Sequence, residues 1–302
     1  MALVVNTNIA SMNAQRSLAA NTNDMKSAME RLSTGKAINS AADDAAGFAI
    51  AETMTAQIRG LSMAAKNSSD ALGLLKVVEN ATNDVTDMLQ RIRELAVQAN
   101  SGTNSVGDIA NLQKEAEALM DEIERVSSDT TYNNQAYLGA AADTTPHVSI
   151  QVGYNDGDTI DIGVYNVHTH NLGSDGLAGT SPGTANNQLT WDNAGTKEYL
   201  QLTQPADAGT SQPGALEVIS DAISQVANYK AEWGALQNRL EYTVSNLMNV
   251  VEFTSAARSR IQDADFAVEA ANLAKSQVLQ QTGTAMLAQA NAAPQLALQL
   301  LK

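Results

Sequence analysis

Apolar residues recur at alternating steps of three and four positions between about residues 46 and 100 of the 302-residue chain. This spacing keeps one face of an α-helix apolar, and its repetition over many turns is typical of a coiled coil. The positions are Met54, Ile58, Leu61, Ala65, Ser68, Leu72, Leu75, Val78, Thr82, Val85, Leu89, Ile92, Ala96 and Ala99. A helix of this length spans roughly 80 Å at about 1.5 Å per residue. The pattern therefore predicts a rod instead of a compact globule.

Two later segments repeat the pattern. A turn-forming stretch at residues 101–104 precedes the first of them and predicts that it returns antiparallel. This first stripe comprises Ile109, Leu112, Ala116, Leu119, Ile123 and Val126. The second comprises Ile219, Ile223, Val226, Trp233, Leu240, Val244, Leu247, Val251, Thr254 and Ile261, and continues through Val268, Ala271, Val278, Thr282, Met286 and Gln289. We therefore predict a mainly α fold of long antiparallel coiled-coil rods from both chain ends.

The middle of the chain has a different composition. Ten of the 19 glycines and four of the five prolines lie between residues 146 and 214. Apolar and other residues alternate at 148–152 and 159–164, on either side of an Asn-Asp-Gly turn at 155–157. Alternation around such a turn predicts a β-hairpin. We expect a small central region of hairpin and loops between the helical ends.

The outermost segments carry apolar side chains without enough neighbours to bury them. In residues 1–34 these are Leu3, Val4, Val5, Ile9, Met12, Leu18, Met25, Met29 and Leu32. At the other end they include Val278, Met286, Leu296 and Leu300. Burial within such a segment does not offset the conformational entropy that ordering it costs. We therefore predict that these residues are polymerisation contacts, which become ordered against each other and against other copies.

Each helical end has an interruption at a similar distance from its terminus. Gly35 is suited to a helix C-cap, and Asp43 or Asp44 to the N-terminus of the next helix. Near the other end, Arg258 and Arg260 precede a second interruption. If the two ends run antiparallel, the interruptions lie side by side. We then expect ion pairs between these aspartates and arginines, with four solvated charges as the alternative.

Charge and composition exclude several classes of function. The net charge is −15, and Lys and Arg are scattered singly. We therefore expect that the chain binds neither nucleic acid nor an anionic membrane. The absence of cysteine excludes a disulfide and a thiol nucleophile. The sequence shows no phosphate-binding glycine loop and no nucleophile elbow. We predict that the chain is not an enzyme and needs no cofactor.

The three histidines are the only candidates for imidazole chemistry. His168 and His170 would project to one side of an extended strand, and His147 lies 21 positions before the first of them. A metal site needs further ligands and a shaped cavity. We interpret all three as surface residues and expect no metal site.

Four sequence stretches together resemble a known family. They are VNTNIASMNAQRSL, ERLSTGKAINSAADDAAGFAIAE, LQRIRELAVQAN and the closing AARSRIQDADFAVEAANLAKSQVLQQTGTAMLAQAN. In this order they are similar to bacterial flagellin, the subunit of the flagellar filament. The resemblance covers about residues 1–170 and 215–302.

The resemblance implies an assignment for each part of the chain. It also implies that the chain forms a homopolymer outside the cell. The chain would be exported unfolded through the flagellar type III apparatus with an export chaperone, and hook-associated junction and cap proteins would be further partners. A hook-associated junction protein or a generic coiled-coil scaffold is the alternative. The expected segments are an inner-tube helix and linker (1–45), rod helices with the hairpin (46–165), a short variable outer region (166–214), a rod helix (215–255), and a linker with inner-tube helix (256–302).

Two further contacts follow from the resemblance. Arg91, Leu95 and Glu115 match the stretch by which Toll-like receptor 5 detects many flagellins, although packing within the filament also explains them. Thr180, Ser181 and Thr184 are hydroxyl residues in the variable region, where some flagellins carry O-linked glycans. A plain loop is the alternative for these three residues.

Overall fold

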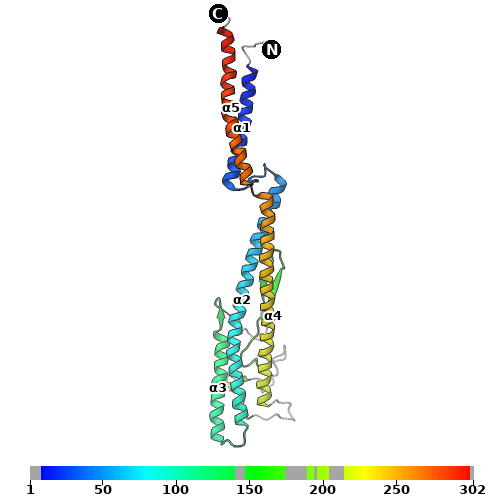
Figure 1. Cartoon of the computed structure of the whole chain (residues 1–302). Helices are drawn as coiled ribbons and strands as arrows, with labels where there is room; N and C mark the ends of the chain where they lie inside the picture. Colours follow the sequence, from blue (N-terminus) through cyan, green and yellow to red (C-terminus); the bar gives the residue numbers. More distant parts are fainter. Residues whose placement is uncertain (1–7, 140–146, 174–188, 194–195, 204–213, 300–302) are drawn as a thin grey trace. The chain divides into compact units, whose positions relative to one another are not determined.

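The structure is a computed structural model that describes residues 8–139, 147–173, 189–193, 196–203 and 214–299 (Figure 1). Long helices dominate these residues, which confirms the predicted mainly α fold. The helices are α1 (Ile9–Thr34), α2 (Ala45–Ala99), α3 (Val106–Asp129), α4 (Ala215–Gln262) and α5 (Phe266–Gln299). The strands are β1 (Thr131–Tyr132), β2 (Gln135–Ala136), β3 (His147–Gln151), β4 (Thr159–Gly163), β5 (Thr190–Asn193) and β6 (Thr196–Tyr199).

The chain forms two compact units. The terminal unit comprises Met1–Arg59 and Val250–Lys302, and the central unit comprises Gly60–Asn249. Helices α2 and α4 therefore contribute one part to each unit. The five-segment division expected from the sequence stays a prediction, because the structure groups the chain only into these two units.

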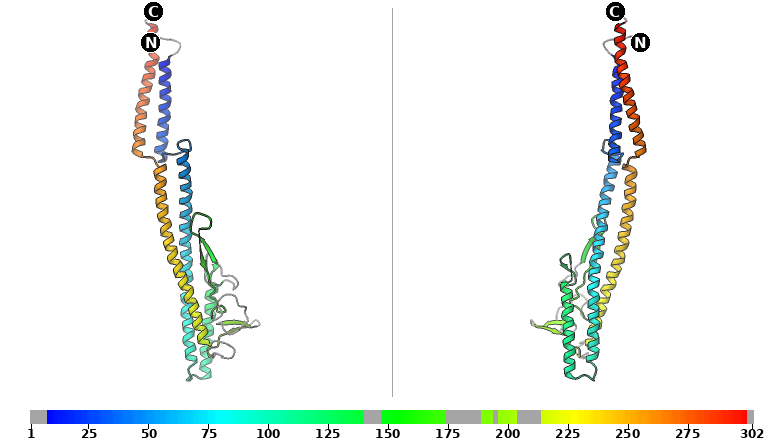
Figure 2. Two further views of the ribbon diagram at one scale, coloured as in Figure 1. Left: turned by 90° about the vertical axis from the view of Figure 1, so that its right-hand side faces the viewer. Right: turned by 60° about the vertical axis from the view of Figure 1, so that its left-hand side comes forward.

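In the terminal unit, α1 and α5 lie side by side and antiparallel (Figures 1 and 2). The Asn8 side chain caps α1 by accepting a hydrogen bond from the backbone N–H of Ser11. Gly35 ends α1 with φ of 72°, a left-handed conformation that glycine adopts without a Cβ penalty. The two interruptions are adjacent, because the Ala37 N–H donates to the Gln262 carbonyl at 2.7 Å.

In the central unit, the stripe predicted between residues 46 and 100 is the buried face of α2. Val85, Leu89 and Ile92 are fully buried. Hydrogen bonds join this helix to α3 through Arg91 and Glu115, and to α4 through other side chains. Residues 101–104 reverse the chain before α3, as their composition predicted.

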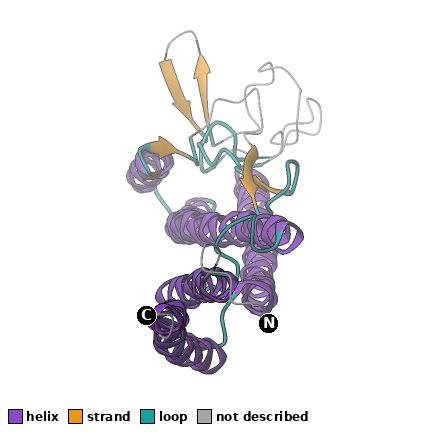
Figure 3. Cartoon of the chain, turned by 90° about the horizontal axis from the view of Figure 1, so that it is seen from above, coloured by secondary structure: helices purple, strands orange, loops and turns teal. Residues whose placement is uncertain are grey.

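The predicted β-hairpin is formed by β3 and β4. These strands pair antiparallel, with Val148 opposite Ile162 and Ile150 opposite Ile160. Gly157 lies in the turn with φ of 88°. Two additional hairpins, β1–β2 and β5–β6, were not predicted (Figure 3). Asn133 and Asn134 both have positive φ between β1 and β2, which is the conformation that tight hairpin turns require.

The described parts of the central segment complete the core of the central unit. The expectation of a short variable loop region gave no sign of this packing. Trp233 on α4 is buried and donates from Nε1 to the Gly163 carbonyl at 2.9 Å. Side chains with at most 1% exposure come from the segment 167–202: Val167, Leu172, Leu189, Leu200 and Leu202.

Candidate assembly surfaces

Helices α1 and α5 face each other through two rows with coiled-coil spacing, which we call the α1–α5 seam. The less exposed residues of α1 at this spacing are Ser11, Ala14, Leu18, Asn21, Met25, Ala28 and Leu32. Those of α5 are Glu269, Leu273, Ser276, Gln280, Gly283, Leu287 and Ala290. Alternating steps of three and four keep each row on one face of its helix. Many of the seam residues are polar or small. Each helix therefore buries few of its large apolar side chains against the other.

Polar contacts set the register of the seam. The Asn21 side chain donates from Nδ2 to the Ser276 carbonyl at 2.8 Å. Near the other end of the helix pair, Asn8 donates from Nδ2 to the Ala290 carbonyl at 2.7 Å. A shift of one helix along the other would break both bonds, and a buried amide without a partner costs free energy.

An ion pair closes the seam near the linker. Arg31 Nη1 lies 3.1 Å from Glu269 Oε1, and the glutamate side chain is only 10% exposed. A carboxylate buried to this extent needs a charged partner. This pair therefore favours the antiparallel alignment in which residues 31 and 269 are adjacent.

The apolar stripe of α5 does not face α1. Val278 and Met286, which the sequence predicts as polymerisation contacts, are exposed, and so is Val268 of the same stripe. The row facing α1 lies one position further along and begins at Glu269. The apolar stripe of α5 gathers large side chains, whereas the row that contacts α1 holds Leu273 and Leu287 among small and polar residues. The stripe on α5 is thus real but points away from α1.

The outward faces of both terminal helices are rich in large apolar side chains. In α1, Ile9 is 66% exposed and Met12 is 56% exposed. In α5, Val278 is 61% exposed and Met286 is 59% exposed. Gathered exposed apolar side chains of this size mark surfaces that bind a partner. Met29, Phe266, Val268 and Leu279 are further exposed apolar side chains of the same two helices.

The other residues predicted for polymerisation fall into two groups. Leu18, Met25 and Leu32 are half-buried on the α1–α5 seam, so contacts within the chain already use part of their surface. The rest, Leu3, Val4, Val5 and Leu300 together with the side chain of Leu296, lie outside the described residues.

The predicted ion pairs between the two interruptions are not formed. Asp43 accepts hydrogen bonds from the Asn39 and Ser40 backbone N–H groups, and these bonds, chiefly the one from Ser40, hold its pKa below the usual value. Asp44 instead caps the first turn of α2. Arg258 donates to Thr55 Oγ1 at 3.2 Å. Within the described residues, no ion pair joins either aspartate to Arg258 or Arg260; a nearby backbone N–H can meet a carboxylate with less loss of side-chain entropy.

The predicted receptor contact is only partly accessible. Arg91 lies between Glu115, at 2.8 Å from Nη2, and Glu94, at 3.0 Å from Nη1, and all three side chains are exposed. The hydrogen bond with Glu115, followed by that with Glu94, raises the pKa of Arg91. Leu95 is fully buried in the core between the helices, so its assignment to a surface contact is wrong.

The expected glycosylation residues Thr180, Ser181 and Thr184 lie outside the described residues. Among the described helices, none has the length and apolar character needed to cross a bilayer.

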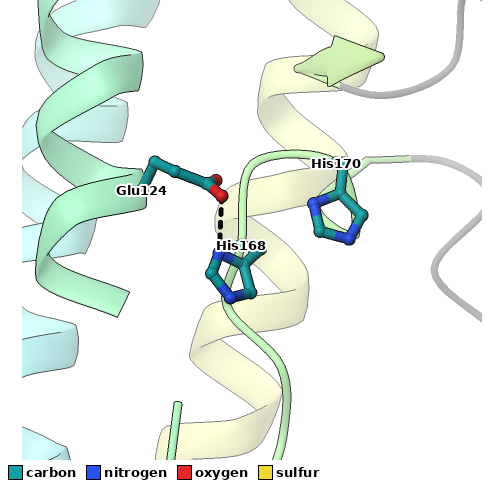
Figure 4. Close-up of side chains that lie close together, drawn as sticks. All are labelled: Glu124, His168 and His170. Atoms are coloured by element: carbon teal, nitrogen blue, oxygen red, sulfur yellow. Dashed lines mark ion pairs between the residues drawn. The ribbon is translucent and has the colours of Figure 1, made fainter. Parts of the chain in front are cut away.

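His168 belongs to a cluster with Glu124 and His170, and it is the one histidine for which the interpretation as a surface residue is wrong; His147 and His170 are exposed. His168 is largely buried, with 13% of its side chain exposed, and its Nδ1 lies 2.8 Å from Glu124 Oε1 (Figure 4). Burial raises the pKa of Glu124, but the Thr169 hydrogen bonds and the His168 charge outweigh it and leave a net lowering. Burial also lowers the pKa of His170. The sequence did not indicate this site, because Glu124 is 44 positions before His168.

Two family models match the chain. The model for the bacterial flagellin N-terminal helical region covers residues 5–142, and the model for the C-terminal helical region covers residues 216–301. The flagellin of Halalkalibacterium halodurans is 39% identical over 300 residues, which span 99% of this chain and 100% of the relative. The flagellin of Bacillus subtilis strain 168 is 40% identical over 307 residues, which span 99% of each chain.

Both relatives are named flagellin, and each match spans nearly the full length of both chains. The alternatives, a hook-associated junction protein or a generic coiled-coil scaffold, are therefore not favoured. The two matched regions also contain the helices that carry the outward apolar faces. This chain therefore belongs to the bacterial flagellin family and is a subunit of the flagellar filament, a structure outside the cell.

Proposed function

We propose that the chain assembles into the filament through the outward faces of α1 and α5. The observation that carries this proposal is the exposure of Ile9, Met12, Met29, Val278 and Met286 on helices whose inner faces are already paired. Burial of one such side chain contributes about 1.5 to 3 kcal/mol. In a filament, neighbouring copies cover these faces, and every subunit gains this stabilisation for each apolar side chain that is buried.

Ordering of the terminal helices and assembly are then coupled. The seam has few large apolar contacts within one chain, because Asn21, Ser276 and Gln280 take positions that a stable isolated coiled coil fills with leucine or isoleucine. Such a pair gains less from folding alone than from folding together with neighbours. Truncation of residues 1–34 should leave a folded monomer that no longer elongates filaments.

Seeded elongation tests the outward faces directly. Purified monomer is added to filament fragments, and growth is followed by light scattering and electron microscopy. Ile9→Glu and Met286→Glu should each reduce the elongation rate at least tenfold, because a charge then enters an apolar contact between copies. Val106→Glu is the matched control, since Val106 is 85% exposed in the central unit. Normal elongation of both terminal variants would exclude this surface.

The remaining partners belong to the same proposal. The chain is exported through the flagellar type III apparatus with the help of a chaperone, and it meets hook-associated junction and cap proteins at the ends of the filament. Its role is structural, without catalysis. Support comes from family membership and from helices whose exposed apolar faces need cover before assembly. Pull-down of a chaperone that protects α5 from proteolysis would test the first step.

A contact with Toll-like receptor 5 through Arg91 and Glu115 is a second proposal. Both side chains are exposed and held by their mutual ion pair at 2.8 Å, so they present a defined polar surface. Monomer should activate a receptor reporter, and the double variant Arg91→Ala/Glu115→Ala should reduce the response.

O-linked glycans at Thr180, Ser181 and Thr184 are likewise proposed. An intact mass equal to that of the bare sequence would exclude them.

A further inference from the structure

We propose that Glu124, His168 and His170 form a site for a divalent transition-metal ion of the zinc type. The site lies wholly within the central unit and is separate from the assembly surfaces. Glu124 projects from α3, whereas both histidines lie on the loop that follows β4 (Figure 4). A bound ion would therefore tie this loop to α3.

The three side chains meet the distance requirement of a shared ion. One imidazole nitrogen from each histidine and one carboxylate oxygen lie within 4.8 Å of one another. Zinc binds imidazole nitrogen and carboxylate oxygen at about 2.0 to 2.2 Å, so ligand atoms on one tetrahedral ion are about 3.3 Å apart. The widest gap must close by at most about 1.5 Å. His170 is the more exposed of the two histidines, although part of its ring stacks on His168, and rotation of its side chain can supply this movement.

The contact between His168 and Glu124 is unusual for a simple ion pair. Nδ1 of His168 is 2.8 Å from Glu124 Oε1, yet it is buried and has no hydrogen-bond partner among the described residues. The oxygen therefore lies close to the nitrogen but away from the direction of a ring N–H. A buried polar atom in this state calls for an explanation, and an ion beside both atoms provides one.

The surroundings select the ligand atoms. A Cβ built at Gly139 would lie 3.0 Å from His168 Nε2, so that side of the ring packs against the backbone and Nδ1 is the available nitrogen. Glu124 Oε2 accepts hydrogen bonds from the Thr169 backbone N–H at 3.2 Å and from the Thr169 hydroxyl at 2.8 Å. These bonds orient the carboxylate and leave Oε1 facing the histidine, which is how outer residues support metal ligands.

The ligand set decides the class of ion. Two imidazoles and one carboxylate suit zinc and its neighbours in the transition series, whereas calcium and magnesium prefer oxygen ligands alone. Three protein ligands leave a position open to water on the exposed His170 side. Lys197, whose charge acts on His170, is held by Asp121 at 2.8 Å, which offsets part of its repulsion towards a cation.

Isothermal titration calorimetry of the full-length monomer with zinc chloride tests the site. We expect one saturable ion per chain, and an affinity at least tenfold lower in His170→Gln. This variant keeps the His168–Glu124 contact and loses only the stacking of His170 on His168, so its unfolding temperature without zinc should stay close to that of the wild type. His147→Gln is the matched control and should bind as the wild type does. Magnesium and calcium should not compete.

Three outcomes would overturn the proposal: no saturable binding, equal affinity in His170→Gln, or an equal loss in His147→Gln. Binding that survives His170→Gln would assign the uptake to other carboxylates of this acidic chain. A second readout is the zinc-dependent rise in unfolding temperature, which should appear in the wild type and vanish in His170→Gln. Imidazole nitrogen shifts on zinc addition should identify His168 and His170, and shifts at His147 alone would contradict the assignment.

Discussion

Leu18 of α1 packs against Gly283 of α5 so closely that a Cβ built on the glycine would lie 3.2 Å from Leu18 Cδ1. At this point the two helices approach so closely that the residue on α5 must be small. Leu18 is half-buried and its terminal methyl group can move by a few tenths of an ångström. The seam therefore tolerates one added carbon but not a branched side chain.

Substitution at Gly283 should separate these cases. Gly283→Ala gains about 1 kcal/mol of helix propensity, which offsets the small displacement of Leu18, so filament stability should change little. Gly283→Val adds two further methyl groups and should lower the stability of the filament by about 1 to 3 kcal/mol. Thermal dissociation of filaments, followed by circular dichroism, measures the difference. Equal stability of the alanine and valine filaments would mean that Gly283 does not face Leu18 in the assembled state.

The Arg31–Glu269 ion pair should show strong coupling in a double-mutant cycle. Arg31→Met leaves a carboxylate that is only 10% exposed without its partner, and we expect filaments to lose about 2 to 4 kcal/mol of stability. The double variant Arg31→Met/Glu269→Leu should recover most of that loss, because no charge remains buried. Additive effects of the two single changes would contradict a direct contact in the filament.

The sequence predicted the helices well because packing in a long rod is periodic. Leu89 and Ile92 are fully buried where the spacing placed them, since one apolar face of α2 meets the same kind of neighbour over many turns. The hairpin around Gly157 was predicted for a similar reason, because both its turn and its alternation are local signals.

Other features depend on contacts between distant segments, which have no local signal. The face of α5 that contacts α1 could not be predicted, because Glu269 and Gly283 become seam residues only in the presence of α1. Likewise, His168 becomes a buried neighbour of Glu124 only when its loop folds onto α3. Sequence periodicity indicates how apolar a face is, and not which partner covers it.

The N-terminus of α3 should respond to pH through Asp108. Its carboxylate accepts hydrogen bonds from the Ser105 hydroxyl and the Ser105 backbone N–H, in that order of effect, and these lower its pKa below the usual 3.8. A carboxylate with a lowered folded pKa contributes stability above its unfolded pKa and loses it as the pH falls through the folded pKa. The contribution should therefore be complete at pH 6 and decline below about pH 4.

Asp108→Asn provides the comparison. Urea unfolding of monomer should show a lower midpoint for the variant at pH 6, because asparagine lacks the charge that favours a helix N-terminus. The gap should narrow as the pH falls below 3.8, where the aspartate of the unfolded chain becomes protonated, and it should close once the pH passes the lower pKa of Asp108 in the folded state. A gap that is constant from pH 6 to the acid limit would show that the charge of Asp108 contributes nothing.

Trp233 should be a principal source of stability in the central unit. Its side chain is 1% exposed, its Nε1 donates to the Gly163 carbonyl at 2.9 Å, and its ring lies beside Tyr165 and Tyr229, which stack at 4.1 Å. Trp233→Phe removes both the donor and part of the volume. We expect a loss of about 2 to 4 kcal/mol in the free energy of unfolding.

The matched control for Trp233→Phe is Tyr242→Phe on the same helix, since Tyr242 is 78% exposed. Its effect should stay within about 0.5 kcal/mol, as for other exposed positions. Urea unfolding of monomer, followed by far-ultraviolet circular dichroism, measures both variants without using tryptophan fluorescence. If the two changes cost the same, the contacts of Trp233 with Gly163 and Tyr165 contribute little to the stability of the central unit.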